Sequence, residues 1–147
     1  MRDPTGRYRW NSMHSTDNQL IERLPRRVQQ RLLTRCEPFE LVPSTALCAC
    51  GGTLTHAYFP ITGRIALQLG PDASEVGVVG RESMLGAELL LGVTRSPWRA
   101  VVQAGGTCWR IEAQALRQAM ADLHTLQALL LRNLMVRVHQ HQALAVR

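Results

Sequence analysis

The sequence predicts a mainly β domain of jelly-roll or double-stranded β-helix type, with flanking helices and a long C-terminal helix. Three observations support this fold class. Short apolar runs between residues 37 and 70 are separated by proline and glycine, as in sheets of many short strands. Residues 75–104 pass from strand to helix and back to strand composition. No glycine or proline follows Gly106, which favours helices up to Arg147.

The composition indicates one globular domain without a membrane segment. The chain has 147 residues, of which 46% are hydrophobic and only 5% aromatic, so aliphatic side chains must fill the core. No apolar run approaches the roughly 18–20 residues needed to cross a bilayer. The first residues also lack the apolar stretch of a signal peptide. The sequence therefore predicts a cytoplasmic protein.

The four cysteines, Cys36, Cys48, Cys50 and Cys108, are interpreted as structural thiols of a reducing compartment. Cys48 and Cys50 are one residue apart, which is neither the usual redox spacing nor a usual zinc spacing. On a strand, residues two apart point to the same face. A metal, sulfur-cluster or redox role for this pair therefore remains an alternative.

The net charge of +6 is compatible with an anionic partner. Much of the excess lies in the first ten residues and in the segment 23–35, where arginines recur at helical spacing. Such a set is also usual on the solvated face of a helix, which is the simpler interpretation. Contact between this segment and nucleic acid is the alternative.

Helices are predicted at the start of the domain. Residues 1–15 have no hydrophobic periodicity and are predicted to form a disordered or basic tail. A first helix follows from Gln19 to Leu24, with Asp17 as its N-cap. Pro25 suits the first position of a second helix, over residues 26–36.

Strand composition then replaces helical spacing. Prolines, the pair Gly51-Gly52 and Gly63 divide the segment into short runs, and Gly63 suits a hairpin turn that needs a positive φ. After the turn at Gly105-Gly106, residues 107–111 form the last predicted strand. The apolar residues of the first runs are Phe39, Leu41, Leu47, Tyr58, Ile61, Ile65, Leu67 and Leu69.

The segment 75–104 is the centre of the predicted fold. Residues 76–79 are rich in valine and predict a strand, which Gly80 ends. A short apolar helix is predicted over residues 84–91, closed by Gly92, and residues 99–103 return to strand composition. The start of a short helix between two strands can hold an anion.

Three motifs of this chain resemble one known family. They are HAYFPITG at residues 56–63, GRESMLG at 80–86 and SPWRAVVQ at 96–103. Together they are similar to the effector domain of Crp/Fnr-type bacterial transcription regulators, a cyclic-nucleotide-binding-like β-roll. The resemblance covers roughly residues 18–147. It implies a β-roll with N-terminal helices over residues 16–121 and a dimerisation helix over residues 122–147.

The C-terminal segment predicts a helix over residues 112–121 and a longer helix up to Arg147, capped by Asp122. Its apolar stripe can belong to the core or pack against a second copy, and we favour a parallel homodimer. The resemblance implies the same dimerisation helix, followed by a winged helix-turn-helix domain. This chain ends within the helix, and either a cut or a naturally shorter protein explains that end. The predicted dimer residues are Leu123, Leu126, Leu130, Leu134, Val138 and His141.

The resemblance also implies where a ligand would bind. In cyclic-nucleotide-binding members, Gly-Glu-Leu opens the short helix of a phosphate cassette, and the Glu accepts the ribose hydroxyl. With Gly86 aligned to the family glycine, Ala87 takes the place of that Glu. Glu88 comes one residue later, which turns its side chain by about 100° on a helix.

The second half of the cassette departs from the family as well. There an Arg-Ser or Arg-Thr pair followed by Ala holds the cyclic phosphate. With Ala100 aligned to that Ala, Trp98 replaces the phosphate-binding Arg and Arg99 replaces the Ser or Thr. Arg95-Ser96 reproduces the pair but comes too early. We therefore interpret the cassette as degraded; cAMP or another cyclic nucleotide is the ligand that the resemblance implies for an intact one.

No catalytic or metal-binding pattern supports an enzyme. A Ser/His/Asp set and an HExxH motif are both missing, and His139 and His141 lie two apart on a predicted helix, facing different ways. The sequence is thus interpreted as a sensor domain of a Crp/Fnr-type regulator that couples a small-molecule signal to a homodimeric helix pair. DNA would be bound only through a C-terminal domain absent from this chain. The alternative is a stand-alone module that binds a cyclic nucleotide or other small ligand.

Overall fold

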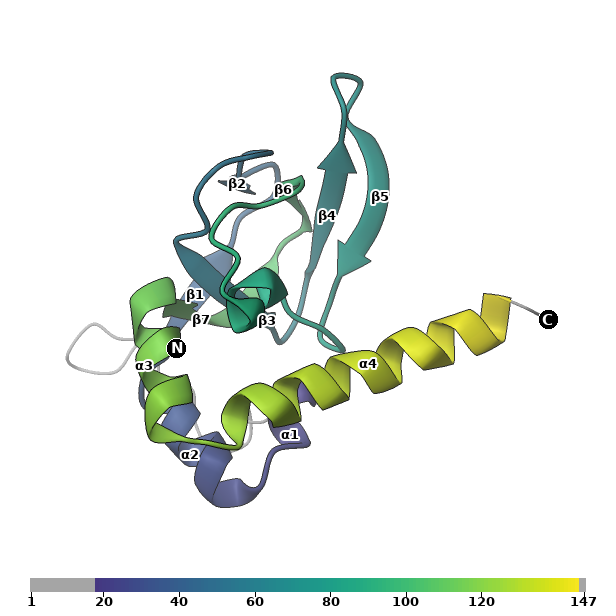
Figure 1. Cartoon of the computed structure of the whole chain (residues 1–147). Helices are drawn as coiled ribbons and strands as arrows, with labels where there is room; N and C mark the ends of the chain where they lie inside the picture. Colours follow the sequence, from purple (N-terminus) through teal and green to yellow (C-terminus); the bar gives the residue numbers. More distant parts are fainter. Residues whose placement is uncertain (1–17, 146–147) are drawn as a thin grey trace.

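The computed structural model describes the backbone of residues 18–145 and the side chains of residues 18–136. Within this range, seven strands form two antiparallel sheets, with the orders β1-β7-β3 and β2-β6-β4-β5. The helices gather at one end of the sheets, and α4 extends away from them (Figure 1). The predicted fold class, a mainly β roll with flanking helices and a C-terminal helix, is confirmed. The strands are β1 (Glu37–Leu41), β2 (Ala46–Cys48), β3 (His56–Pro60), β4 (Arg64–Leu69), β5 (Ser74–Val79), β6 (Arg99–Ala104) and β7 (Gly106–Glu112), and the helices are α1 (Gln19–Glu22), α2 (Arg26–Leu33), the 3-10 helix η1 (Ala87–Leu91), α3 (Ala113–Asp122) and α4 (Leu126–Ala145).

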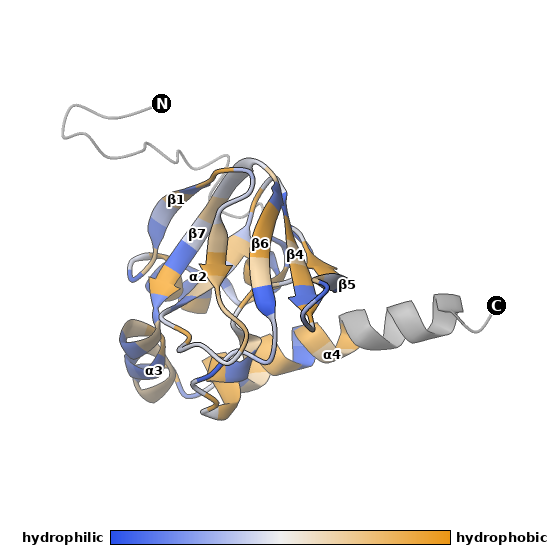
Figure 2. Cartoon of the chain, turned by 90° about the horizontal axis from the view of Figure 1, so that it is seen from above, coloured by the Kyte–Doolittle hydropathy of each residue, from blue (hydrophilic) through white to orange (hydrophobic). Residues whose placement is uncertain are grey.

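Strand β7 divides two hydrophobic cores, because alternate side chains of a strand point to opposite faces. Cys108 faces the inside of the roll, where it packs with residues of both sheets such as Tyr58 and Ile65. Trp109 and Ile111 face the helices and join a core built mainly from helix residues. Figure 2 shows hydrophilic and hydrophobic segments occurring along the same strands. The first sheet is therefore covered on both faces.

The turn between β3 and β4 lies against the start of β7. The backbone N–H groups of Ile61 and Thr62 both donate to the carbonyl oxygen of Thr107, at 2.9 and 3.1 Å. The hydroxyl of Thr62 accepts from Thr107 N at 3.0 Å. A Cβ at Gly106 would lie 2.5 Å from the Thr62 carbonyl oxygen, so only glycine fits there.

Asn18, rather than Asp17, caps the first helix. Its Oδ1 accepts hydrogen bonds from the N–H groups of Leu20 and Ile21, at 3.0 and 3.3 Å. Its Nδ2 donates to the carbonyl oxygens of Pro60 and Ser83, each at 2.9 Å, and this joins α1 to the roll. The prediction of Asp17 as the N-cap is thus wrong, because these contacts place Asn18 at the cap position.

Helix α2 is shorter than predicted. Pro25 occupies the N-cap position and not the first helical position, and the helix ends at Leu33 instead of Cys36. The N–H groups of Arg35 and Cys36 bond to carbonyl oxygens three residues back, which is a tightened last turn. The Cys36 thiol donates to the Leu32 carbonyl oxygen at 3.4 Å.

The break between the last two helices also differs from the prediction. Asp122 is the last residue of α3, and α4 begins only at Leu126. Asp122 therefore does not cap α4; the carbonyl oxygen of Thr125 accepts the first bond of that helix, from Leu129 N at 2.9 Å. Within residues 18–145, the helices include none with the length and apolar character needed to cross a membrane.

Candidate ligand-binding site

The family cassette would lie at η1, and this helix starts later than predicted. Leu85 pairs with Tyr58 of β3 through two backbone hydrogen bonds of 2.9 Å, so Leu85 forms a β-bridge and is not part of the helix. Gly86 then turns the chain with a φ of 93°, and Ala87 starts a 3-10 helix. A Cβ at Gly86 would approach Ala57 Cα to 3.1 Å. The positive φ and this close approach both favour glycine at the position.

Ala87 and Glu88 are the first two residues of η1, where the resemblance places the ribose-binding carboxylate. Ala87 has no polar side chain, and its methyl group packs against the helix-side core. The half-buried Glu88 carboxylate makes no hydrogen bond to another side chain among the described residues; its backbone carbonyl accepts from Val93 N at 3.0 Å. The sequence-based conclusion that the first half of the cassette is altered stays a prediction until a ligand is tested.

The side chains of Arg95 and Ser96 make hydrogen bonds within and next to the loop that carries them. The Arg95 Nη1 donates to the Gly51 carbonyl oxygen at 2.9 Å. Ser96 is buried, and its hydroxyl accepts from Trp98 N at 3.3 Å and lies 3.5 Å from the Cys48 thiol. Both residues therefore stabilise the packing of the loop before β6 against the turn at residues 49–52.

Arg99 and Ala100 lie on opposite faces of β6. Ala100 is fully buried in the roll together with Val102, as strand alternation requires. Arg99 is exposed on the outer face, where its Nη1 donates to Gln68 Oε1 at 3.1 Å. The half-buried Trp98 comes just before the strand. The guanidinium group of Arg99 thus points away from the inside of the roll.

Aromatic and aliphatic side chains fill the inside of the roll. The rings of Phe39 and Tyr58 have centroids 5.7 Å apart and are tilted. Burial of the Tyr58 hydroxyl raises its pKa, and the nearby guanidinium of Arg110 opposes this shift. The other members of this cluster are Leu41, Leu47, Cys48, Ile65, Leu67, Val79, Leu85, Ala100, Val102 and Cys108.

Arg110 places a cation beside this inner cluster, and sequence reasoning missed it. It lies two residues after the buried Cys108 on β7, so the alternation of that predicted strand was the available signal. Its guanidinium carbon lies 4.1 Å from the centroid of the Phe39 ring, and its Nε donates to Glu37 Oε1 at 2.6 Å. The guanidinium of Arg110 is therefore already paired with the carboxylate of Glu37.

Cys48 and Cys50 do not share a strand face. Cys48 is the last residue of β2, whereas Cys50 lies in the following turn. Their thiols donate to the carbonyl oxygens of Trp98 and Pro97, at 3.7 and 3.3 Å, so both hold the loop before β6. No group of three metal-ligating side chains is found in the described part of the chain. Burial raises the pKa of the Cys108 thiol to about 12, which disfavours its reactive thiolate.

The predicted dimer stripe on α4 is partly contradicted. Leu126 and Leu130 have no exposed surface, and Leu123 just before the helix is 8% exposed, so their own chain covers them. Leu134 is half-buried against the same core. Val138 and His141 lie outside the described side chains. The first turns of the helix therefore belong to the core and cannot form an interface in this arrangement.

Together, the two-sheet roll, the short helix before β6 and the C-terminal helix are the elements of a cyclic-nucleotide-binding-like β-roll. The family model of the cyclic nucleotide-binding domain matches residues 38–122. The chain therefore belongs to the cyclic nucleotide-binding domain family. No curated protein sequence matches it.

Solved structures of transcription regulators have the same fold. The N-terminal domain of a transcriptional regulator from Streptomyces coelicolor A3(2) is 15% identical with a TM-score of 0.65, over 89% of this chain and 94% of that chain. The sensor domain of the regulator DNR from Pseudomonas aeruginosa is 20% identical with a TM-score of 0.61, over 84% and 85%. The c-di-GMP responsive global regulator CLP from Xanthomonas campestris is 15% identical with a TM-score of 0.65, over 81% and 60%. The resemblance found in the sequence is confirmed at the level of family and fold.

Proposed function

We propose that this chain is the sensor domain of a Crp/Fnr-type transcription regulator and works as a homodimer through the outer part of α4. The observation that carries the proposal is the change in exposure along this helix. Leu126 and Leu130 are fully buried, whereas Met135 and Val136 are 52% and 41% exposed. The helix thus leaves its own core while its side chains are still apolar.

An apolar side of a helix that projects from a domain is stabilised when another apolar surface covers it. A second copy of the same helix is the natural cover in a symmetric dimer, because each surface then meets its own equivalent. The likeness to regulator sensor domains supports this choice. A signal in the roll would then reach the helix pair through the buried first turns of α4.

Sedimentation velocity tests the dimer. We expect the parent chain to sediment as a dimer and the double variant Met135→Glu/Val136→Glu as a folded monomer. Each chain of the variant would bring two carboxylates to the symmetric contact, and the four negative charges would repel one another. The matched control is Val42→Glu/Leu69→Glu, which places carboxylates at apolar sites that are 51% and 46% exposed on other parts of the roll. A parent chain that sediments as a monomer at all concentrations would contradict the proposal.

The signal is proposed to differ from a cyclic nucleotide bound through the family cassette. Trp98 takes the place of the phosphate-binding Arg, and Arg99 points outward beside Gln68. Losing a charge-assisted hydrogen bond costs about 1.5–3 kcal/mol, or roughly 10- to 150-fold in affinity. Calorimetric titration with cAMP, cGMP and c-di-GMP should therefore show no micromolar binding. Micromolar cAMP binding that is lost in Arg99→Ala would show that this cassette works after all.

In this role the chain is cytoplasmic and binds rather than converts its ligand, in keeping with a regulatory family. DNA binding would belong to a helix-turn-helix domain beyond Arg147. The alternative remains a stand-alone ligand-binding module. Reading the gene downstream of Arg147 separates the two functions, since an encoded helix-turn-helix supports the regulator and a stop codon supports the module.

A further inference from the structure

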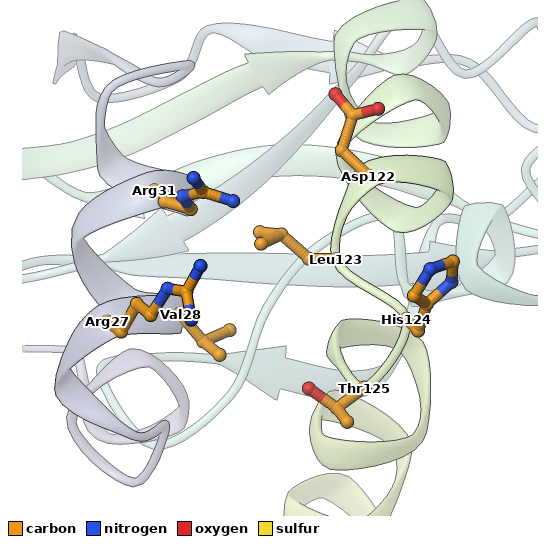
Figure 3. A pocket seen from close by; sticks show the side chains of 7 residues that line it. All are labelled: Arg27, Val28, Arg31, Asp122, Leu123, His124 and Thr125. Carbon is orange, nitrogen blue, oxygen red and sulfur yellow. The ribbon is translucent and has the colours of Figure 1, made fainter.

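An open pocket lies between α2 and the turn that joins α3 to α4, on a different part of the domain from η1 and β6. Its volume is about 240 Å³. Helix α2 provides one wall, and the turn provides the other (Figure 3). The lining residues are Arg27, Val28, Arg31, Asp122, Leu123, His124 and Thr125.

The α2 wall carries positive charge that no carboxylate of residues 18–136 pairs with. Arg27 and Arg31 are one helical turn apart, and both guanidinium groups extend toward Leu123 in the centre of the pocket (Figure 3). Neither side chain makes an ion pair or hydrogen bond with another residue in the described range 18–136. Two guanidinium groups that converge on one space form a binding site for a phosphate or carboxylate.

The carboxylate of the lining, Asp122, is already bonded to side chains that do not line the pocket. Asp122 Oδ2 accepts from Arg35 Nη2 at 2.7 Å, and its Oδ1 accepts from Gln118 Nε2 at 3.5 Å. The Arg35 Nη1 is buried and has no hydrogen-bond partner in the described part of the chain. Positive charge therefore remains in excess around the pocket, even with Asp122 included.

The remaining lining suits an anion with a small organic part. Thr125 presents a hydroxyl, and α4 begins at the next residue, so the positive end of a 20-residue helix lies beside the pocket. Val28 and Leu123 add apolar surface. The volume is below the roughly 300–1,000 Å³ of pockets for drug-sized ligands, so a phosphate group with a few carbon atoms is the appropriate size.

We propose that this pocket binds a small phosphate-bearing ligand, with Arg27 and Arg31 as the phosphate-binding residues. The ligand would bridge α2 and the start of α4 and so hold the helix in its position against the core. This site is independent of the family cassette and of the dimer. It is therefore open to a test of its own.

Isothermal titration calorimetry of the full chain at low ionic strength tests the site, with inorganic phosphate and glycerol 3-phosphate as probes. We expect saturable binding that weakens about 10-fold or more in Arg27→Gln and in Arg31→Gln, because each removes a charge-assisted contact. Arg26→Gln is the matched control: it removes the same charge from an exposed neighbour on α2 that does not line the pocket. Its affinity should change less than about twofold, since exposed charges at a distance are screened.

The two probes distinguish the sources of the phosphate. Tighter binding of glycerol 3-phosphate indicates a phosphate ester whose carbon atoms contact Val28 and Leu123, whereas equal affinity indicates free phosphate. Thermal unfolding by circular dichroism confirms that each variant is folded. The absence of saturable binding, or an equal loss in Arg26→Gln and Arg31→Gln, would overturn the proposal, because the second result describes only a diffuse effect of net charge.

Discussion

Leu130→Glu is expected to unfold much of the protein instead of only separating a dimer. Leu130 has no exposed surface and packs with Leu126 and residues of α1 in the helix-side core. A carboxylate there would be buried without a partner, which costs about 3–5 kcal/mol. The lost apolar contacts add about 2–5 kcal/mol, against a total stability of about 5–15 kcal/mol for a domain.

Urea unfolding followed by circular dichroism measures this effect, with Met135→Glu as the control on the same helix. Met135 is 52% exposed, so the control should keep the unfolding midpoint of the parent when both are compared as monomers. Leu130→Ala gives a milder variant that remains folded enough for measurement. A Leu130→Glu variant as stable as the control would contradict the placement of Leu130 in the core.

Gly106→Ala is expected to destabilise the roll by about 3 kcal/mol or more, because the new methyl group overlaps fixed backbone atoms. A Cβ at this position would lie 2.5 Å from the carbonyl oxygen of Thr62 and 2.6 Å from its Oγ1. The turn cannot move away freely, since Ile61 and Thr62 are both hydrogen-bonded to Thr107. The lost stability should appear as a lower urea midpoint with an unchanged slope.

Gly77→Ala is the matched control for this variant. A Cβ at Gly77 would meet only Leu67 Cδ1 at 3.5 Å, which is an ordinary contact, and Gly77 lies within strand β5. Its stability should change by no more than about 0.5 kcal/mol. Equal effects of the two substitutions would show that the close approach of Thr62 to Gly106 does not limit the fold.

Local patterns were sufficient to predict the roll. The last strand, predicted over residues 107–111, is β7 at Gly106–Glu112. A short apolar run that begins directly after a Gly-Gly turn favours a strand over other secondary structure. The turn at Gly63 likewise has the positive φ, 85°, that its glycine suggested. The strand composition of residues 99–103 likewise corresponds to β6 (Arg99–Ala104), in which Ala100 is buried and Arg99 is exposed.

Tertiary contacts determine the helix cap, the surface that covers the α4 stripe and the pocket, which local sequence patterns could not predict. Asp17 and Asn18 are both good capping residues, and the bonds from Asn18 to Pro60 and Ser83 choose between them. The stripe on α4 predicts an apolar face and does not specify which surface covers it. The phosphate pocket joins Arg31 to Thr125 from distant parts of the chain, and no motif at either end indicates that they meet.

Hydrogen exchange along α4 tests the proposed function most directly, because it compares both parts of one helix in one sample. Backbone amides of residues 130–134 should exchange slowly at every protein concentration, since their own core protects them. Amides of residues 136–145 should gain protection as the concentration rises from micromolar to millimolar and the helices pair. Exchange in residues 136–145 that stays independent of concentration would mean that no second copy covers the helix, and would contradict the proposed dimeric sensor.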